Sequence, residues 1–187
     1  MSRPKELVLY FISDPSVTAD PGGALATEAR IVKDPILIKG IDDLVTRVVQ
    51  TCNKRGGRVK AMVLASHGNS AVFDIGANTA SAGDPRLWKL AVLRGWFTPG
   101  AVVVINACEC GQNHELMRQL AVILGVTVIA YTGDIDVYKW GPFEGVVPGG
   151  NKVICTASGC RETNSMEVFR QAFERGPGEP PGWAREI

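Results

Sequence analysis

The chain has 187 residues, and its 20 lysines and arginines nearly balance its 19 aspartates and glutamates, for a formal net charge of +1. This balance gives no excess of positive charge that would indicate binding to nucleic acid or to an anionic membrane surface. With 45% apolar and 21% charged residues, the composition is that of an ordinary globular domain with a sizeable core.

The cysteines and the N-terminal region bear on the compartment. Five cysteines, an odd number, form no obvious disulfide framework. The first apolar run, residues 7–12, is too short for a signal peptide or a membrane span, and Ser13-Asp14-Pro15 follows it at once. We therefore expect a reduced, cytoplasmic protein with no membrane partner, although export without a cleavable signal would leave the same pattern.

The first half of the chain alternates between strand and helix patterns. The predicted elements are a strand at 6–12, a loop at 18–24, a helix at 41–52, a strand at 59–66, a short strand at 71–75 and a helix at 84–93. The strand at 59–66 is an almost continuous apolar run, as in strands buried on both faces. Pro85 suits the first position of the last helix.

The second half continues the alternation and then changes character. The predicted elements are a turn at 98–100, a strand at 101–107, a helix at 114–124, a strand at 127–132 and a short helix at 166–175. Between the last two, residues 135–140 and 152–158 are expected to form an antiparallel pair joined by a Pro/Gly-rich turn.

This order predicts an α/β fold with three layers, α-β-α, around a mostly parallel central sheet, with a C-terminal antiparallel hairpin. No linker divides the chain. We expect a single domain over residues 1–175 and a Pro/Gly-rich tail at 176–187.

Two predicted strands end at chemically reactive side chains. Ala65-Ser66-His67-Gly68 closes one apolar run, and Asn106-Ala107-Cys108 closes another. Active sites of parallel α/β sheets lie at the carboxyl ends of the strands. His67 would then lie beside Cys108. A thiol with an adjacent imidazole base is the smallest set of groups that supports cysteine nucleophilic catalysis. The backbone N–H groups of Gly68 and Cys108 are candidate donors to an oxyanion.

These strings also resemble a known superfamily. Residues 66–70, S-H-G-N-S, and residues 106–111, N-A-C-E-C-G, are similar to the histidine and cysteine motifs of the caspase-fold (clan CD) cysteine peptidases. The closest motifs are those of the legumain, caspase-like and CHAT-type group. The resemblance spans residues 6 to about 135 in topology.

The resemblance implies a caspase-like fold and a cysteine-type endopeptidase, a thiol protease that hydrolyses polypeptide substrates. Cys108 would be the nucleophile and His67 the general base and acid, with no cofactor and no metal. Cys110 departs from the pattern, because serine usually stands at that position. It would be either a spare thiol or one half of a disulfide that gates activity.

Substrate preference is expected to depend on two loops. In the family that this chain resembles, loops after the first strand and after the strand following the cysteine build the pocket for the first substrate residue. Here they supply Asp14, Asp134 and Asp136, and an acidic pocket would select lysine or arginine. Asp14 and Asp134 suit turns equally well, and Trp140 offers an apolar lining instead.

Two other functions remain open from the sequence. Four side chains, Cys108, Cys110, His114 and His67, provide the ligand number of a structural zinc site, although C-x-C-x₃-H is not a common spacing. A caspase-fold domain without catalysis, acting as an interaction or regulatory module, is the other alternative. The phosphate-binding string GxxxxGK[ST] is absent. The oligomeric state is left open.

Overall fold

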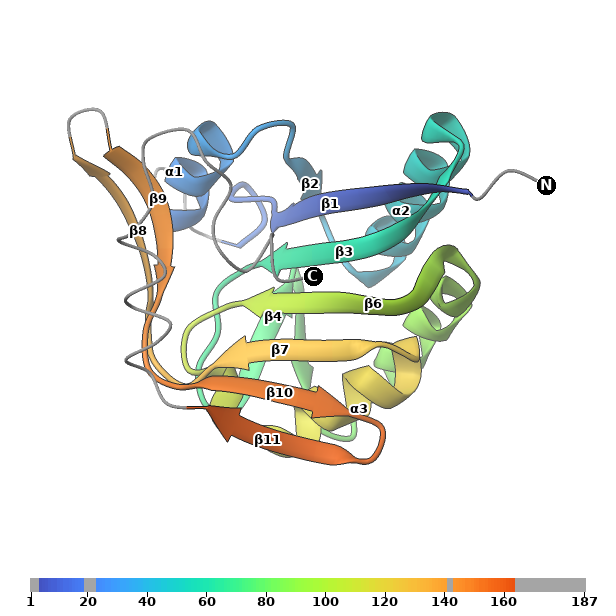
Figure 1. The fold of residues 1–187 in the computed structure, drawn as a ribbon. Coiled ribbons are helices and arrows are strands. Elements are labelled where there is room, and N and C mark those ends of the chain that lie inside the picture. The colour runs from blue at the N-terminus through green and yellow to red at the C-terminus, as the bar shows by residue number, and fades with distance from the viewer. Residues whose placement is uncertain (1–3, 19–22, 141–142, 164–187) are drawn as a thin grey trace.

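A seven-stranded, mostly parallel sheet forms the centre of the computed structural model, which describes residues 4–18, 23–140 and 143–163 (Figure 1). In sheet order the strands are β11 (Gly159–Thr163), β10 (Lys152–Thr156), β7 (Thr127–Tyr131), β6 (Phe97–Asn106), β3 (Gly57–Ala65), β1 (Lys5–Ser13) and β2 (Ile36–Ile38). The five strands from β7 to β2 are parallel, and β10 and β11 are antiparallel to their neighbours.

The helices cover both faces of the sheet. They are α1 (Ala24–Ile31), α2 (Ile41–Arg55), the 3₁₀ helix η1 (Pro85–Trp96), the short 3₁₀ turn η2 (Cys110–Gln112) and α3 (His114–Leu124). The larger core joins α2, η1 and α3 to one face, whereas α1 packs through Leu25 against Ile12 on the other. Right-handed crossovers require this arrangement, because the connection from β1 to β2 runs in the opposite direction along the sheet from all the later ones. The predicted three-layer α/β class is confirmed.

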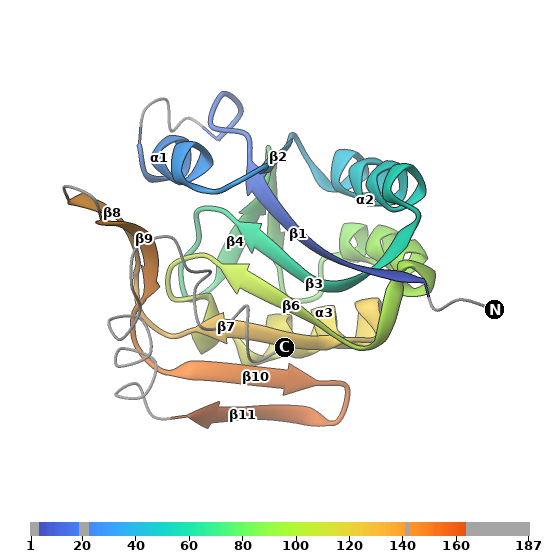
Figure 2. The same ribbon diagram turned by 45° about the horizontal axis from the view of Figure 1, so that its top comes forward.

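Two small antiparallel sheets flank the main one. β4 (Val72–Ile75) pairs with β5 (Asn78–Ser81), and β8 (Ile135–Trp140) pairs with β9 (Phe143–Pro148). The β8–β9 hairpin and α1 lie at the end of the sheet to which the parallel arrows point, and they contact each other (Figures 1 and 2).

The expected pairing of residues 135–140 with 152–158 is wrong. β8 pairs instead with β9, inside the segment expected to be a turn, and β10 joins β7 in the main sheet. Val153 and Cys155 explain the choice, since both are fully buried in the core against the sheet's larger helical layer. A strand with that much buried apolar surface is more stable inside the sheet than in an outlying hairpin.

Other differences from the sequence prediction are local. The helix at 84–93 is present as the 3₁₀ helix η1, begun by Pro85 and capped by Asp84, and nothing in its sequence distinguishes the two helix types. Residues 98–100, expected to form a turn, lie inside β6, where a register shift against β3 accommodates them. The sequence prediction missed α1, β2, β5 and β11. The expected helix at 166–175 and tail at 176–187 lie outside the described residues.

The helix α3 has the predicted bounds, and the apolar side of its sequence explains why. Six of its eleven residues are buried, and Asn113 caps its start by accepting the Leu116 N–H. Gly125 ends it in the left-handed conformation, which glycine adopts without steric cost. In the part of the chain that the structure describes, none of the helices has both the length and the apolar character needed to cross a bilayer.

Candidate active site

The carboxyl ends of β1, β3 and β6 lie side by side at one edge of the sheet (Figure 1). One row of paired residues crosses all three strands: Ile12, Ala65 and Asn106. Asp14, His67 and Cys108 each come two residues after this row. Adjacent strands are about 4.8 Å apart. The structure therefore places His67 and Cys108 at neighbouring parallel strand ends, where the sequence predicts them, and their chemical roles remain predictions.

Backbone hydrogen bonds hold the two strand ends together beyond the sheet itself. The Ser66 N–H donates to the Asn106 carbonyl oxygen at 3.1 Å, which continues the β3–β6 ladder by one step. The His67 carbonyl then accepts the Asp74 N–H at 2.9 Å, so β4 fixes the histidine backbone from the other side. The His67 side chain is partly exposed.

Cys108 is partly exposed, and a backbone N–H points at its sulfur. The Ile135 N–H, at the start of β8, donates to Cys108 Sγ at 3.3 Å. An N–H directed at a sulfur favours negative charge there, the form in which a thiol is nucleophilic. The sequence offered no signal for this donor, because any residue except proline carries the same backbone group.

The segment around Cys108, residues 107–112, is called the Cys108 turn below. Glu109 has a φ of 55°, the left-handed conformation, which costs a non-glycine residue roughly 1 kcal/mol. Its N–H donates to the Gly133 carbonyl at 2.9 Å. The segment that leads into β8 therefore holds the turn at two points, at Gly133 and at Ile135.

The two predicted oxyanion donors lie on this edge. Gly68 pairs with Phe73 in an antiparallel bridge whose hydrogen bonds are made by the flanking residues, so its own N–H points away from Phe73. Across the described stretches of the chain, neither the Gly68 nor the Cys108 N–H donates to a backbone carbonyl. Both groups remain candidates for binding a substrate oxygen.

The N–H directed at the Cys108 sulfur does not come from the start of α3. The η2 turn separates Cys108 from α3, and Asn113 already caps the first turn of the helix. The N–H directed at the sulfur belongs to Ile135 instead.

Cys110 is a packing residue and makes no disulfide. It is 1% exposed, its thiol donates to the Val72 carbonyl at 3.7 Å, and burial raises its pKa to about 12. A Cβ at Gly68 would lie 2.6 Å from Cys110 Sγ. The thiol therefore occupies the space left by the missing side chain at position 68, and it joins the Cys108 turn to the segment after His67. The gating disulfide considered for Cys110 is not formed.

This contact predicts coupling between the two positions. Gly68→Ala should lower the free energy of unfolding by about 2 kcal/mol through overpacking, and Cys110→Ala by about 1 kcal/mol through a small cavity. In the double variant the 2.6 Å contact is gone, although Ala107 Cβ at 3.0 Å still crowds the new methyl group. We expect a combined loss about 1 kcal/mol smaller than the sum. Urea denaturation of the four proteins measures it, and strict additivity would contradict the contact.

The three aspartates differ in their surroundings. The Asp14 carboxylate accepts both the N–H and the hydroxyl of Ser16, at 2.9 and 2.7 Å, and these bonds lower its pKa. It therefore closes a turn after β1, on the same edge as His67. Asp134 is exposed, and it lies between Gly133 and Ile135, which contact the Cys108 turn. Asp136 is exposed two residues further along β8, and Trp140 ends that strand.

The four side chains of the zinc alternative do not gather. Cys110 is buried against Gly68, whereas His114 is exposed at the start of α3. Within residues 4–18, 23–140 and 143–163, no group of three or more histidine, cysteine, aspartate or glutamate side chains is arranged to hold a metal ion. The structure gives this alternative no support.

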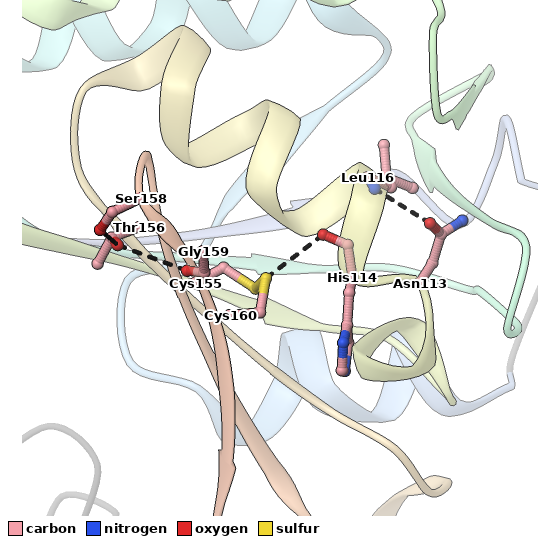
Figure 3. The surroundings of a disulfide bond; sticks show 8 residues. All are labelled: Asn113, His114, Leu116, Cys155, Thr156, Ser158, Gly159 and Cys160. Atoms are coloured by element: carbon pink, nitrogen blue, oxygen red, sulfur yellow. Dashed lines mark hydrogen bonds between the residues drawn. A yellow bond between two sulfur atoms is a disulfide. The ribbon is translucent and has the colours of Figure 1, made fainter.

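The expectation of a fully reduced protein is wrong for one pair of cysteines. Cys155 and Cys160 face each other across β10 and β11 and form a disulfide (Figure 3). Cys160 Sγ lies 3.4 Å from the His114 carbonyl oxygen, a packing contact, since a disulfide sulfur carries no proton. The pair was missed because its partners are brought together only by strand pairing. Cys52, Cys108 and Cys110 remain free thiols.

Comparison with known proteins adds no assignment. A scan against protein-family models and a search of curated protein sequences both give no match. The function of the protein must therefore be inferred from its own residues and their geometry.

Proposed function

We propose that this protein is a cysteine hydrolase, and specifically a cysteine-type endopeptidase, with Cys108 as nucleophile and His67 as general base and acid. One observation carries the proposal. His67 and Cys108 stand at the carboxyl ends of adjacent parallel strands, and the Ile135 N–H points at Cys108 Sγ. The motif resemblance to caspase-fold peptidases supports the same assignment and adds the peptide substrate.

The proposed reaction has two halves. His67 accepts the Cys108 thiol proton, and the sulfur attacks the carbonyl carbon of the scissile bond. The Gly68 and Cys108 N–H groups stabilise the negative oxygen that forms. His67 then gives its proton to the departing amine, which leaves a thioester on Cys108. Water, deprotonated by His67, attacks this thioester and releases the acid and the free thiol.

A preference for a basic residue before the cleaved bond is the finer part of the proposal. Asp134 supports it best, since this exposed carboxylate follows Gly133 and precedes Ile135, both in contact with the Cys108 turn. Asp14 supports it less, because Ser16 already binds its carboxylate. A cleavage profile on a peptide library tests the preference, and removal of the Asp134 charge should weaken it.

Alkylation tests the nucleophile directly. Iodoacetamide at pH 7 should modify one cysteine per chain, Cys108, faster than it modifies a thiol in a short unstructured peptide. Cys52 and Cys110 are each 1% exposed, and burial raises the pKa of both. The other two cysteines are in the disulfide. Mass spectrometry of tryptic peptides locates the label, and Cys108→Ala serves as the unlabelled control.

The opposite outcome supports the catalytically silent alternative. If Cys108 reacts no faster than the reference thiol and the peptide library is not cleaved, the chain is an interaction or regulatory domain and the proposed chemistry is wrong.

A further inference from the structure

Three polar side chains from three different elements meet inside an otherwise apolar layer. Glu28, on α1, is 2% exposed. Its Oε1 accepts the Asn106 side-chain N–H at 2.8 Å, and it also accepts the Tyr10 hydroxyl. The Asn106 Nδ2 lies 3.4 Å from that hydroxyl as well. This trio, called the Glu28 cluster below, joins α1 to β1 and to the last residue of β6.

Packing alone does not account for a carboxylate at this place. Burial of an ionised group is costly unless it is paired, and it raises the pKa of Glu28. The Tyr10 pKa is likewise raised, first by burial and then by the neighbouring carboxylate. An apolar side chain would dock α1 on the sheet without this cost, as Leu25 does one turn earlier against Ile12. Attachment of α1 to the sheet therefore does not by itself explain why a carboxylate is buried at position 28.

The position of Asn106 provides that explanation. Asn106 is the last residue of β6 and comes two residues before Cys108. Its side chain is held by Glu28, and its carbonyl accepts the N–H of Ser66, the residue before His67. One residue thus links the buried carboxylate to both strand ends that carry the proposed chemistry.

The helix α1 also contacts the β8–β9 hairpin. The first residue of β8 is Ile135, the donor to Cys108 Sγ. Tyr10 and Ile135 pack on the same small apolar cluster: Val63, Val104, Ile129 and Tyr131. The Glu28 cluster therefore joins α1 to the end of β6, and α1 in turn contacts the hairpin that begins at Ile135.

We propose that Glu28, acting through Asn106, is a positioning residue that fixes the Cys108 turn beside His67 and the Ile135 N–H. It touches neither the thiol nor a substrate. The part of this inference that concerns rate rests on the proposed hydrolase function, whereas the part that concerns the order of the Cys108 turn does not. A displacement of about 1 Å in such a site lowers the rate by about a hundredfold.

Three variants separate positioning from simple stability. Glu28→Leu keeps a side chain of similar size on α1 but removes the oxygen that accepts the Asn106 N–H. Glu28→Gln keeps an acceptor oxygen in the same place. Leu25→Ala, the matched control, removes a buried α1 side chain and leaves the hydrogen bonds intact. Each is assayed well below its melting temperature for peptide cleavage, for Cys108 alkylation, and for hydrogen–deuterium exchange of the Cys108 turn and residue 135.

We expect Glu28→Leu to lower kcat about ten- to a hundredfold with little change in KM, to slow alkylation, and to speed exchange in the Cys108 turn at least tenfold. Glu28→Gln should stay within about threefold of the unaltered protein. Leu25→Ala should lose melting temperature but keep kcat and the exchange pattern.

Exchange rates of Glu28→Leu equal to those of Leu25→Ala would overturn the inference, because Glu28 would then matter only for the attachment of α1. If the unaltered protein neither cleaves peptides nor reacts at Cys108, the proposed function fails on its own, and the exchange comparison still decides whether Glu28 orders the turn.

Discussion

Replacement of Cys108 by alanine is expected to abolish peptide hydrolysis, with a fall in kcat of at least about 10⁴-fold. The sulfur that would form the thioester is then gone, and no other thiol can take its place. Cys110 is 1% exposed, its thiol is hydrogen-bonded to the Val72 carbonyl, and its pKa is raised to about 12.

Replacement of His67 by alanine should lower kcat about 10²- to 10⁴-fold, the usual contribution of a general acid–base group.

The double variant gives the sharper result. If Cys108 and His67 act as one unit, the loss in the double variant should match that of Cys108→Ala alone, because the histidine has no role without the thiol. Cys52→Ala, at a thiol buried in α2, is the matched control and should leave kcat unchanged. Cleavage that persists in Cys108→Ala, measured on the same peptide library, would assign the activity elsewhere.

Gly111→Ala is expected to destabilise the fold and displace the Cys108 turn together. A Cβ at position 111 would lie 2.6 Å from the carbonyl carbon and 2.8 Å from the carbonyl oxygen of Tyr131, and 3.0 Å from the Thr132 nitrogen. These are backbone atoms at the end of β7, which cannot rotate away. We expect a loss of about 3 kcal/mol in the free energy of unfolding. For a chain of this length, that lowers the melting temperature by roughly 6–12 °C.

A second glycine provides the control for this prediction. Gly95 has open space around its position, and Gly95→Ala should leave the melting temperature unchanged or raise it slightly. Thermal denaturation followed by circular dichroism compares the two variants, and peptide cleavage at 20 °C reports on the turn. A Gly111→Ala protein as stable as the Gly95→Ala protein would contradict the close approach of the Cys108 turn to β7.

The elements that the sequence predicts well are those with strong, regular patterns. The strands β3 and β6 can be recognised from their apolar runs, and α3 from its amphipathic pattern. A buried strand and a helix with one buried face each require a characteristic spacing of apolar residues, and that spacing is visible in the sequence. α1 and β2 were missed because eight and three residues are too few to show a period. The pairing of β10 with β7 depends on which apolar strand gains most from the core, a competition that a local pattern does not record.

The candidate site likewise contains features that the sequence predicts and others that it does not. Parallel strands bring their carboxyl ends to one edge, so the positions of His67 and Cys108 after two buried runs were enough to predict that they are neighbours. The aspartates were selected from loops by resemblance, and the structure shows that Ser16 already engages one of them, Asp14. The disulfide between Cys155 and Cys160 joins residues five apart in the chain, and only the antiparallel pairing of β10 with β11 makes them partners.

By itself, the sequence determined the three-layer α/β class and the strand ends at which the candidate dyad stands, because hydrophobic periodicity and the order of elements are properties of the chain. Tertiary structure alone decided what surrounds the dyad. The Ile135 N–H at the sulfur, the packing of Cys110 against Gly68 and the Glu28 cluster all join residues between 18 and 96 positions apart. Such contacts involve backbone groups and buried polar atoms whose partners are chosen by the packing of distant elements, and no local pattern in the sequence encodes them.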